Sequence, residues 1–207
     1  MRQAGVSDYE AFARQVLMHI PSHPISFEVF ADELPEMEKQ ARYIASWGKN
    51  VNVKIPVTNT KGIFTGPIIQ RLANEGISIN VTAVMTIEQA EAISKCFAPD
   101  MASIVSVFAG RIADSGVDPE PHLKKILDIF AHHPNIDILW ASPRELFNIV
   151  QADRVGCHII TVGTDLLNKL SLIGKDLTQF SLETVTMFAK DAQAANFSIQ
   201  REPVFIN

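Results

Sequence analysis

Short runs of apolar, β-branched residues alternate along the chain with longer stretches in which apolar positions recur at helical spacing. The short runs contain few charged residues, which is typical of strands buried on both faces of a parallel sheet. Successive runs mostly begin about 20 to 35 residues apart, which is the length of one β–α unit. Six strands are predicted: Ile25–Phe30, Val51–Val57, Ile77–Val84, Ala102–Phe108, Ile136–Ala141 and Cys157–Val162.

Helical patterns fill the intervals between these strands. Ser7 is expected to cap the first helix, with Glu10 completing a capping box. Gly48 is expected to stop the second helix, because glycine readily adopts the left-handed conformation that follows a last turn. The later helices are predicted at Glu33–Trp47, Thr65–Asn74, Ile87–Phe97 after a Thr86 cap, Pro119–His133, Pro143–Asp153, Thr164–Leu172 and Ser181–Ala195.

This alternation predicts an α/β fold, either a (β/α)8 TIM-type barrel or an open, doubly wound sheet. Neither GxGxxG nor GxxxxGK[ST] follows any of the strands, which disfavours dinucleotide and P-loop sites. We therefore favour the barrel, although a closed barrel of this type needs eight strands and a helix precedes the first predicted strand here. No linker or low-complexity tract interrupts residues 1–207, so a single domain is expected.

Composition and charge narrow the class of protein. The 207 residues are 47% hydrophobic and 20% charged, which is typical of a globular protein and not of a disordered one. The net charge of −5, without basic runs, argues against nucleic acid as a partner. The two cysteines form no ligand pattern, the first residues do not resemble a signal peptide, and no apolar run reaches the ~18 residues of a membrane span. We expect a cytoplasmic protein with no membrane partner.

Polar side chains lie near the C-terminal ends of several predicted strands, where burial costs free energy unless the groups are paired or used. Glu28 and Lys54 are ionisable. Asn80 and Thr82 are two residues apart and share one face of the third strand, where they could simply bond to each other. The others, all close to the ends of later strands, are Ser106, Arg111, Ser142 and Arg144.

In a β/α barrel the C-terminal strand ends meet at one mouth, where active sites lie. Together, the polar residues just described would supply an amine, a carboxylate, small hydrogen-bonding groups and a cation at that mouth. An unprotonated lysine amine can attack a carbonyl and form a Schiff base. A carboxylate and a hydroxyl nearby can hold the water that transfers protons, and an arginine with a serine suits a sugar phosphate.

These residues also have purely structural interpretations. Lys54 could be a snorkelling edge residue, and Glu28 could be its structural ion-pair partner. Arg111 could be a surface charge paired with Asp114. In a doubly wound sheet, the strand order would leave Lys54 and Arg111 far from each other, so the fold itself decides between these possibilities.

The sequence around these residues resembles the transaldolase family, and within it the small transaldolase-like and fructose-6-phosphate aldolase branch. The VKIPVT segment alone is moderately specific, whereas the segments in this order are quite specific together. The resemblance covers Met1 to about Ile199 and rests on ISFEVFA, VNVKIPVTNTKG, EGISINVTAVMTIEQA, SVFAGRIADSGVDP, ILWASPRELFN and QADRVGCHIIT.

The resemblance implies a role for each residue. Lys54 matches the Schiff-base lysine of the family. Glu28 matches its water-holding glutamate, a position where the aldolase branch tends to have glutamine, so this residue favours transaldolase. Asn80 and Thr82 match residues around the catalytic water and the carbinolamine. The substrate and phosphate positions are matched by Ser106, Arg111, Ser142 and Arg144.

The implied reaction transfers a dihydroxyacetone unit from a ketose phosphate to an aldose phosphate, as in the pentose phosphate pathway, and needs no metal or organic cofactor. One alternative is an aldolase that releases free dihydroxyacetone. Another is an inactive paralogue that binds sugar phosphates or acts as a regulatory subunit, and a third is a doubly wound protein that binds a small ligand. A homo-oligomer is expected, with the C-terminal helix at residues 181–195 as an oligomer or packing element.

The chain departs from the family at its N-terminus. The family begins with a strand that contains an acid/base aspartate, and a second strand ends in a T-T-N-P segment. Neither precedes Ile25, and Met1 falls where the family has an internal residue just after that segment. The resemblance therefore predicts a barrel without its first two strands, whose open sheet edges favour association.

Overall fold

The computed structural model describes residues 6–98 and 100–196. The chain divides into two compact units, Met1–Gly163 and Thr164–Asn207. The first unit contains the whole sheet, and the second contains the last helices.

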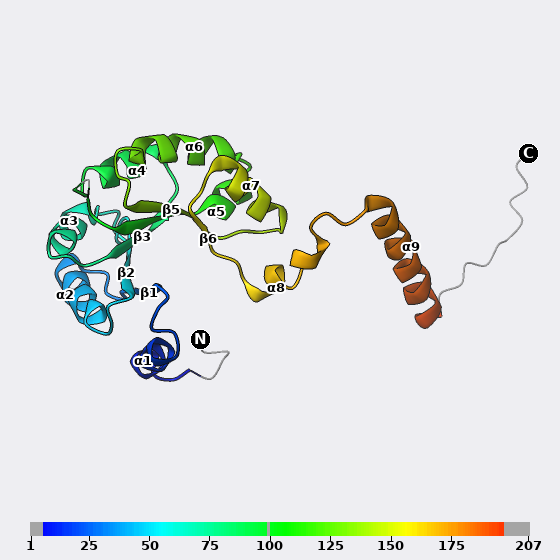
Figure 1. Cartoon of the computed structure of the whole chain (residues 1–207), viewed down its shortest axis with the longest axis horizontal. Helices are drawn as coiled ribbons and strands as arrows, with labels where there is room; N and C mark the ends of the chain where they lie inside the picture. Colours follow the sequence, from blue (N-terminus) through cyan, green and yellow to red (C-terminus); the bar gives the residue numbers. More distant parts are fainter. Residues whose placement is uncertain (1–5, 99, 197–207) are drawn as a thin grey trace, which may run out of the picture. The chain divides into compact units, whose positions relative to one another are not determined.

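A six-stranded parallel sheet forms the centre of the first unit. Its strands lie side by side in chain order, and the sheet curls so that one side is concave (Figure 1). This order confirms a partial β/α barrel and excludes a doubly wound sheet, in which the strand order reverses at a switch point. The strands are β1 Ile25–Glu28, β2 Val51–Pro56, β3 Ile79–Val84, β4 Ser103–Val107, β5 Ile136–Trp140 and β6 Ile159–Ile160.

One helix precedes the first strand, and the helices that connect the strands cover the convex side of the curled sheet (Figure 1). In the first unit they are α1 Tyr9–His19, α2 Leu34–Ala45, α3 Gly66–Asn74, α4 Ile87–Ser94, α5 Ala109–Asp114, α6 Pro119–Phe130 and α7 Phe147–Val155. The second unit contains α8 Thr164–Leu167, a 3₁₀ turn at Leu170–Leu172, and α9 Leu177–Ala194.

The predicted cap of α1 is wrong. Asp8, not Ser7, is the capping residue, because its carboxylate accepts a hydrogen bond from the Ala11 N–H at 3.0 Å. Glu10 consequently lies one position too early for a capping box, and its carboxylate accepts from Arg14 at 2.9 Å instead. A short polar side chain at either position, Ser7 or Asp8, can satisfy the free N–H groups of a first turn, so the sequence pattern alone does not distinguish them.

The ends of other helices also differ from the predicted ends. Helix α2 ends at Ala45, before the predicted stop at Gly48. Helix α7 begins at Phe147 and not at Pro143, because the Asn148 side chain accepts from the backbone N–H groups of Arg144 and Glu145 and forms a turn there. Helix α9 begins four residues early, with Asp176 as its cap. The short helix α5 was not predicted.

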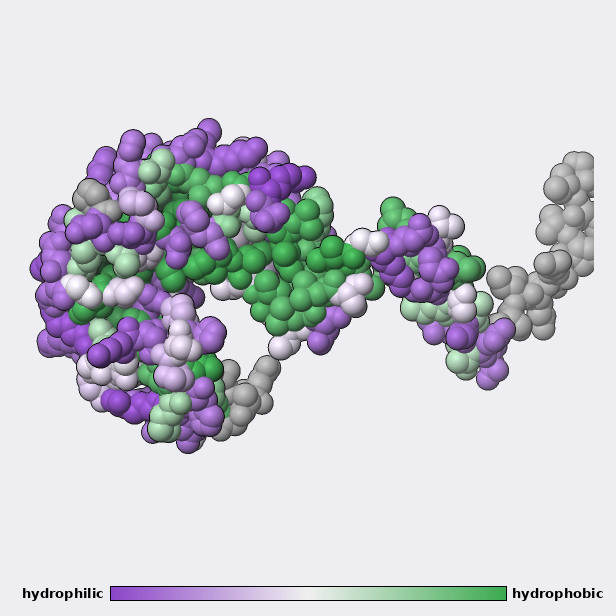
Figure 2. All heavy atoms as spheres, in the orientation of Figure 1, coloured by the Kyte–Doolittle hydropathy of each residue, from purple (hydrophilic) through white to green (hydrophobic). Residues whose placement is uncertain are grey.

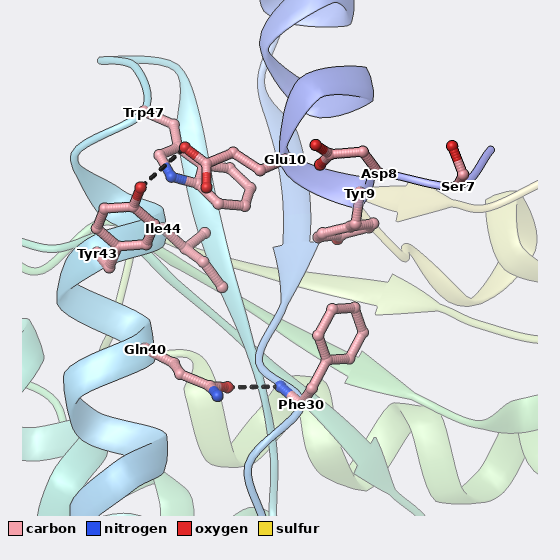
Figure 3. Close-up of a pocket in the computed structure, with 9 residues that line it drawn as sticks. All are labelled: Ser7, Asp8, Tyr9, Glu10, Phe30, Gln40, Tyr43, Ile44 and Trp47. Atoms are coloured by element: carbon pink, nitrogen blue, oxygen red, sulfur yellow. Dashed lines mark hydrogen bonds between the residues drawn. The ribbon is translucent and has the colours of Figure 1, made fainter.

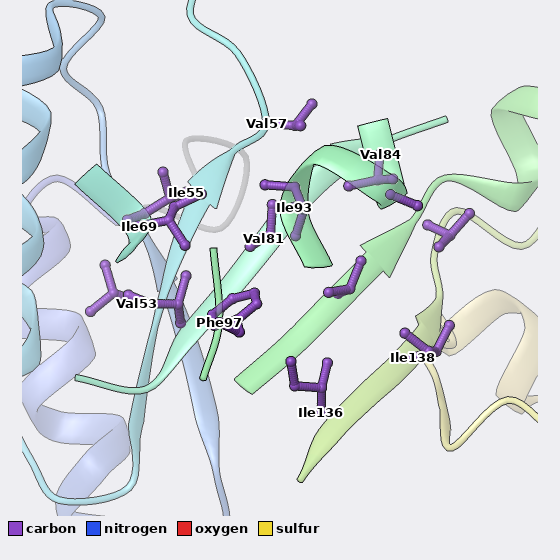
Figure 4. Close-up of a cluster of buried hydrophobic side chains, with 14 of the residues drawn as sticks. Val53, Ile55, Val57, Ile69, Val81, Val84, Ile93, Phe97, Ile136 and Ile138 are labelled. Atoms are coloured by element: carbon purple, nitrogen blue, oxygen red, sulfur yellow. The ribbon is translucent and has the colours of Figure 1, made fainter. Parts of the chain in front are cut away.

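Apolar side chains pack on both sides of the sheet. On the convex side, alternate residues of the strands pack against the helices; Figure 4 labels Val53, Ile55, Val81 and Ile138 from strands with Ile69 and Ile93 from helices. The concave side has a smaller cluster made of Ile104, Leu139 and Ala141, and apolar surface gathers over β5 and β6 in Figure 2. Because side chains alternate along a strand, the remaining positions face the concave side.

An aromatic cavity of about 440 Å³ lies beside β1, between α1 and α2 (Figure 3). Its rings pack edge to face, with the Tyr9 and Phe30 centroids 4.9 Å apart and those of Tyr43 and Trp47 6.0 Å apart. The Tyr43 hydroxyl donates to the Glu10 carboxylate at 2.8 Å. This packing holds α1 and α2 against the edge strand, and none of the predicted site residues lines the cavity.

Candidate active site

A separate cleft of about 470 Å³ opens on the concave face of the sheet. Four of the predicted site residues line it: Lys54, Asn80, Ser106 and Ser142. They come from β2, β3, β4 and the residues just after β5, so the curled sheet brings together groups that are far apart in the sequence. The other predicted residues, Glu28, Thr82, Arg111 and Arg144, do not line it.

Strand register explains why the ionisable side chains share the concave face. Glu28 pairs with Lys54 across β1 and β2, and Lys54 pairs with Asn80 across β2 and β3. Paired residues in parallel strands point to the same side of the sheet. Val53 and Ile55, on either side of Lys54, are buried against the helices of the convex side, so the Lys54 side chain faces the cleft.

Lys54 is half-buried and makes neither a hydrogen bond nor an ion pair with any residue in the described ranges. The structural interpretation of Glu28 as its ion-pair partner is therefore not realised. Lys54 is not a snorkelling edge residue either, because β2 pairs with β1 on one side and β3 on the other. Its amine is left available for chemistry in the cleft.

A chain of side-chain hydrogen bonds crosses the concave face above β2. The Asn80 amide Nδ2 donates to Ser26 Oγ at 2.9 Å, and Ser106 Oγ donates to Asn80 Oδ1 at 2.7 Å. Asn80 and Ser106 are almost fully buried. These bonds fix the orientation of the Asn80 amide. Asn80 and Thr82 do not bond to each other, because the Thr82 hydroxyl has no partner among the described residues.

Thr82 lies where β3 departs from regular geometry. The register of β3 against β4 shifts between Val81 and Val84, and Ala83 has a φ of 62°. A bulge of this kind re-aims side chains, and a left-handed non-glycine residue costs of order 1–3 kcal/mol. The Thr82 side chain is buried, and its hydroxyl makes no hydrogen bond within the described part of the chain. Such an orphaned hydroxyl is unusual and fits a group that bonds to substrate or to a water.

The two arginines predicted for the site have different surroundings. Arg144 donates through Nε to an Asp114 carboxylate oxygen at 3.0 Å, and the pair is bidentate. The expected alternative pair of Arg111 with Asp114 is therefore wrong. Arg111, on the exposed side of α5, makes no ion pair with a residue that the structure describes.

A close backbone contact brings α5 to the loop after β5. The Gly110 N–H donates to the Ala141 carbonyl oxygen at 3.3 Å, and a Cβ on Gly110 would lie 1.5 Å from the Ser142 carbonyl oxygen. Only glycine fits there. Ser142 itself has a φ of 59°, another left-handed non-glycine residue. The contact places the residues around Arg111 beside those around Ser142.

The described part of the chain also contains metal-ligating and thiol side chains outside the cleft. Within residues 6–98 and 100–196, no group of three or more His, Cys, Asp or Glu side chains is placed to hold a metal ion. Burial raises the pKa of the Cys96 thiol, and it raises the pKa of the Cys157 thiol to about 12, so neither is a ready nucleophile. The helices in the same ranges include none with the length and apolarity that crossing a membrane requires.

Comparison with known sequences decides the family. The family model described as Transaldolase/Fructose-6-phosphate aldolase matches residues 8–201, a range that includes every predicted site residue. This chain belongs to the transaldolase/fructose-6-phosphate aldolase family. The recognition made from the sequence motifs is thus confirmed.

Relatives within the transaldolase/fructose-6-phosphate aldolase family agree. A probable transaldolase of Dehalococcoides mccartyi is 34% identical over 167 residues, which cover 80% of this chain and 74% of the relative. A probable transaldolase from Thermoanaerobacter sp. is 32% identical over 184 residues, which cover 88% of this chain and 79% of the relative. A solved structure of a mandelate oxidase mutant has a TM-score of 0.51 at 12% identity, over 75% of this chain and 51% of that one, which shows likeness of fold alone.

Sequence reasoning missed seven residues that line the cleft, among them Ser26, Phe108 and Thr161. The strand alternation contained the signal for two of them. Ser26 is two residues before Glu28, and Phe108 is two residues after Ser106, so each shares the concave face. Thr161 follows the shortest strand, whose register could not be read from the sequence.

Proposed function

We propose that this chain is a transaldolase that transfers a dihydroxyacetone unit from a ketose phosphate to an aldose phosphate through a Schiff base at Lys54. The observation that carries the proposal is the Lys54 amine, which faces a polar cleft without an ion-pair partner in the described ranges. Membership of the family, with relatives named probable transaldolase, supports it.

Lys54 is the proposed nucleophile. Its neutral amine attacks the ketose carbonyl carbon, the carbonyl oxygen leaves as water, and a protonated imine remains. The protonated imine at C2 accepts the electron pair of the C3–C4 bond as that bond breaks and the C4 hydroxyl loses its proton to the held water, which releases the aldose and leaves an enamine on Lys54. The enamine carbon then attacks the aldehyde of a second aldose, and water frees the product and the amine.

Glu28 and Thr82 are proposed to hold the water that carries protons during these steps. The orphaned hydroxyl of Thr82 supports this role, because it has a bonding capacity that no described residue uses. Asn80 is proposed to bond to the carbinolamine. Its second amide hydrogen is free for this, since Ser26 and Ser106 occupy its other groups.

The phosphate of the substrate is proposed to bind at Arg111 and Ser142. Arg111 is a cation without an ion-pair partner among the described residues, and the close contact at Gly110 supports a shared location for the two. Ser106 is proposed to contact the substrate chain. Arg144 is held by Asp114 and would add a second positive charge beside Ser142.

We further propose a cytoplasmic homo-oligomer with sugar phosphates as substrates and no nucleic-acid or membrane partner. The net charge of −5 disfavours nucleic acid as a partner. The C-terminal helix supports the oligomer: α9 has no buried residue, and Leu177 and Phe188 are 79% and 61% exposed. Large apolar side chains that lie exposed together on one helix are typical of an interaction surface.

The experiment that tests the proposal traps the imine. Incubation with fructose 6-phosphate and sodium borohydride should add a sugar-derived mass to the peptide that contains Lys54. Lys61→Arg is a matched control, because Lys61 is exposed and ion-paired with Glu33. A label on another lysine, or one that survives Lys54→Ala, would contradict the proposal.

A second measurement separates the alternative activities. With fructose 6-phosphate, a transaldolase turns over only when an acceptor such as erythrose 4-phosphate is present. Release of free dihydroxyacetone without the acceptor would indicate the aldolase. Trapping at Lys54 without turnover under either condition would indicate the inactive, sugar-phosphate-binding paralogue.

A further inference from the structure

Thr161 directly follows β6 and continues its pairing with β5. Its backbone N–H donates to the Trp140 carbonyl oxygen at 3.2 Å. The register pairs Leu139 with Ile159 and advances one residue at a time along both strands, so it brings Thr161 opposite Ala141. Because residues paired in this way point to the same side, the Thr161 side chain faces the concave side together with Ala141, and both line the cleft.

The register also places Thr161 at the same height as Lys54. Lys54 of β2 pairs with Asn80 of β3, and Asn80 pairs with Ile104 of β4. Ser106 lies two residues beyond Ile104 on β4. In the same way, Ser106 of β4 pairs with Leu139 of β5, and Leu139 pairs with Ile159 of β6. Thr161 lies two residues beyond Ile159. A constant stagger of this kind sets inward side chains from alternate strands in one layer of a barrel.

The three members of this layer, Lys54, Ser106 and Thr161, differ in whether their polar group already has a hydrogen-bond partner. Ser106 uses its hydroxyl proton in the bond to Asn80. Thr161 is exposed in the cleft, and its hydroxyl makes no hydrogen bond with a residue of the described ranges. The layer thus contains a free amine on one wall and a free hydroxyl on the opposite wall, with the open cleft between them.

We propose that the Thr161 hydroxyl binds a hydroxyl group of the ketone held at Lys54 and so positions the three-carbon unit. The proposal rests on the function proposed above. A dihydroxyacetone unit has a hydroxyl on each side of its carbonyl carbon, so a side chain that faces the imine across the cleft meets a hydroxyl and not a methyl group. Thr161 is therefore a substrate-binding residue that helps to select hydroxylated ketones.

The test measures borohydride trapping at Lys54 with two ketones, dihydroxyacetone and acetone, which lacks both hydroxyl groups. Thr161→Val keeps the shape of the side chain and removes its hydroxyl. It should raise the dihydroxyacetone concentration for half-maximal trapping about 2- to 10-fold, as expected for loss of one hydrogen bond, and leave trapping of acetone unchanged. Thr161→Ser should behave like the unaltered chain, and so should Thr178→Val, whose substitution lies on the exposed surface of α9.

Each other result overturns a definite part of the proposal. Equal losses with both ketones, or a loss in Thr161→Ser, would mean that Thr161 only supports the fold. Unchanged trapping of dihydroxyacetone by Thr161→Val would show that its hydroxyl does not contact substrate. Failure of the unaltered chain to trap either ketone at Lys54 would instead overturn the proposed function, on which this role depends.

Discussion

Two arginines beside the cleft differ in how their charge is compensated. Arg144 forms a bidentate pair with Asp114, whereas Arg111 has no acidic partner among the described residues. An uncompensated guanidinium near a cleft attracts an anion more strongly than a paired one, because no bond must be exchanged. The difference favours Arg111 over Arg144 as the proposed phosphate ligand.

Arg111→Ala is therefore expected to raise KM for fructose 6-phosphate by more than tenfold, since a charge-assisted phosphate contact contributes roughly 1.5–3 kcal/mol. Trapping of unphosphorylated dihydroxyacetone at Lys54 should change much less. Steady-state kinetics and trapping measure the two effects, with Arg14→Ala as a control at an exposed arginine paired with Glu10. Equal losses on both substrates would mean that Arg111 supports the fold.

At the scale of the elements, α2 and α3 are joined by a shared carboxylate. Glu38 accepts from Arg71 and from Arg42, each at 2.6 Å, and its side chain is only 13% exposed. These bonds, that of Arg71 first, hold the pKa of Glu38 near 2, below its ordinary value of 4.5. A lowered folded-state pKa means that the stabilisation is present above pH 4.5 and is lost as the pH falls toward 2.

Glu38→Gln should lower the melting temperature at pH 7 by the equivalent of about 1 kcal/mol, because the two arginines are themselves well exposed and screened by solvent. The difference from the unaltered chain should shrink as the pH is lowered from 4.5 to 2. Thermal unfolding followed by circular dichroism measures it. Glu36→Gln, in an exposed pair on the same helix, is the control; a difference that is constant with pH would exclude the ion pairs as its cause.

The close approach of α5 to the loop after β5 predicts that Gly110 cannot be replaced without loss of stability. Gly110→Ala would place a methyl group against the Ser142 carbonyl oxygen, so the helix or the loop must move. We expect a loss of about 1–3 kcal/mol in the free energy of unfolding, together with weaker binding of phosphorylated sugars. Ala113→Ser, at an exposed position of the same helix, should change neither. Unaltered stability in Gly110→Ala would contradict the contact.

The elements also show what the sequence could and could not predict. Every strand was found because buried parallel strands are apolar, and Lys54 and Asn80 stood out as polar exceptions to that rule. The helix α5 was missed because six residues are too few for a periodic pattern. The bond from Asn80 to Ser26 was missed because it depends on how strongly the sheet curls, which no local pattern contains. Helix caps failed where two short polar residues were adjacent.

At the scale of the whole molecule, two features favour association. Within the described residues, the sheet ends in strands β1 and β6, each of which pairs with another strand on one side, and unpaired strand edges are templates for further pairing. Helix α9 exposes Leu177, Val185 and Phe188 on one face, with Gln179 and Lys190 on the other. Either feature would be covered in an assembly of several copies.

We expect light scattering to give a mass that is a multiple of 22.9 kDa. Phe188→Glu, on the apolar face of α9, should reduce that mass, because it places a charge in a contact that must lose water. Lys190→Gln, on the opposite face of the same helix, is the control. A monomer for the unaltered chain would contradict the association, and an unchanged assembly in Phe188→Glu would point to the strand edges.

Because the strands pair strictly in chain order, the sheet has a built-in gradient of protection. Opening β1 or β6 breaks a single ladder, whereas exposing β3 or β4 requires two ladders to open. Hydrogen–deuterium exchange should therefore begin at the two outer strands and reach the amides of β3 and β4 last. Every ladder also joins neighbouring β–α segments, so contact order is low for so large a sheet, and the chain can fold by adding one segment at a time. Uniform exchange over all six strands would instead indicate that the sheet opens as one cooperative block.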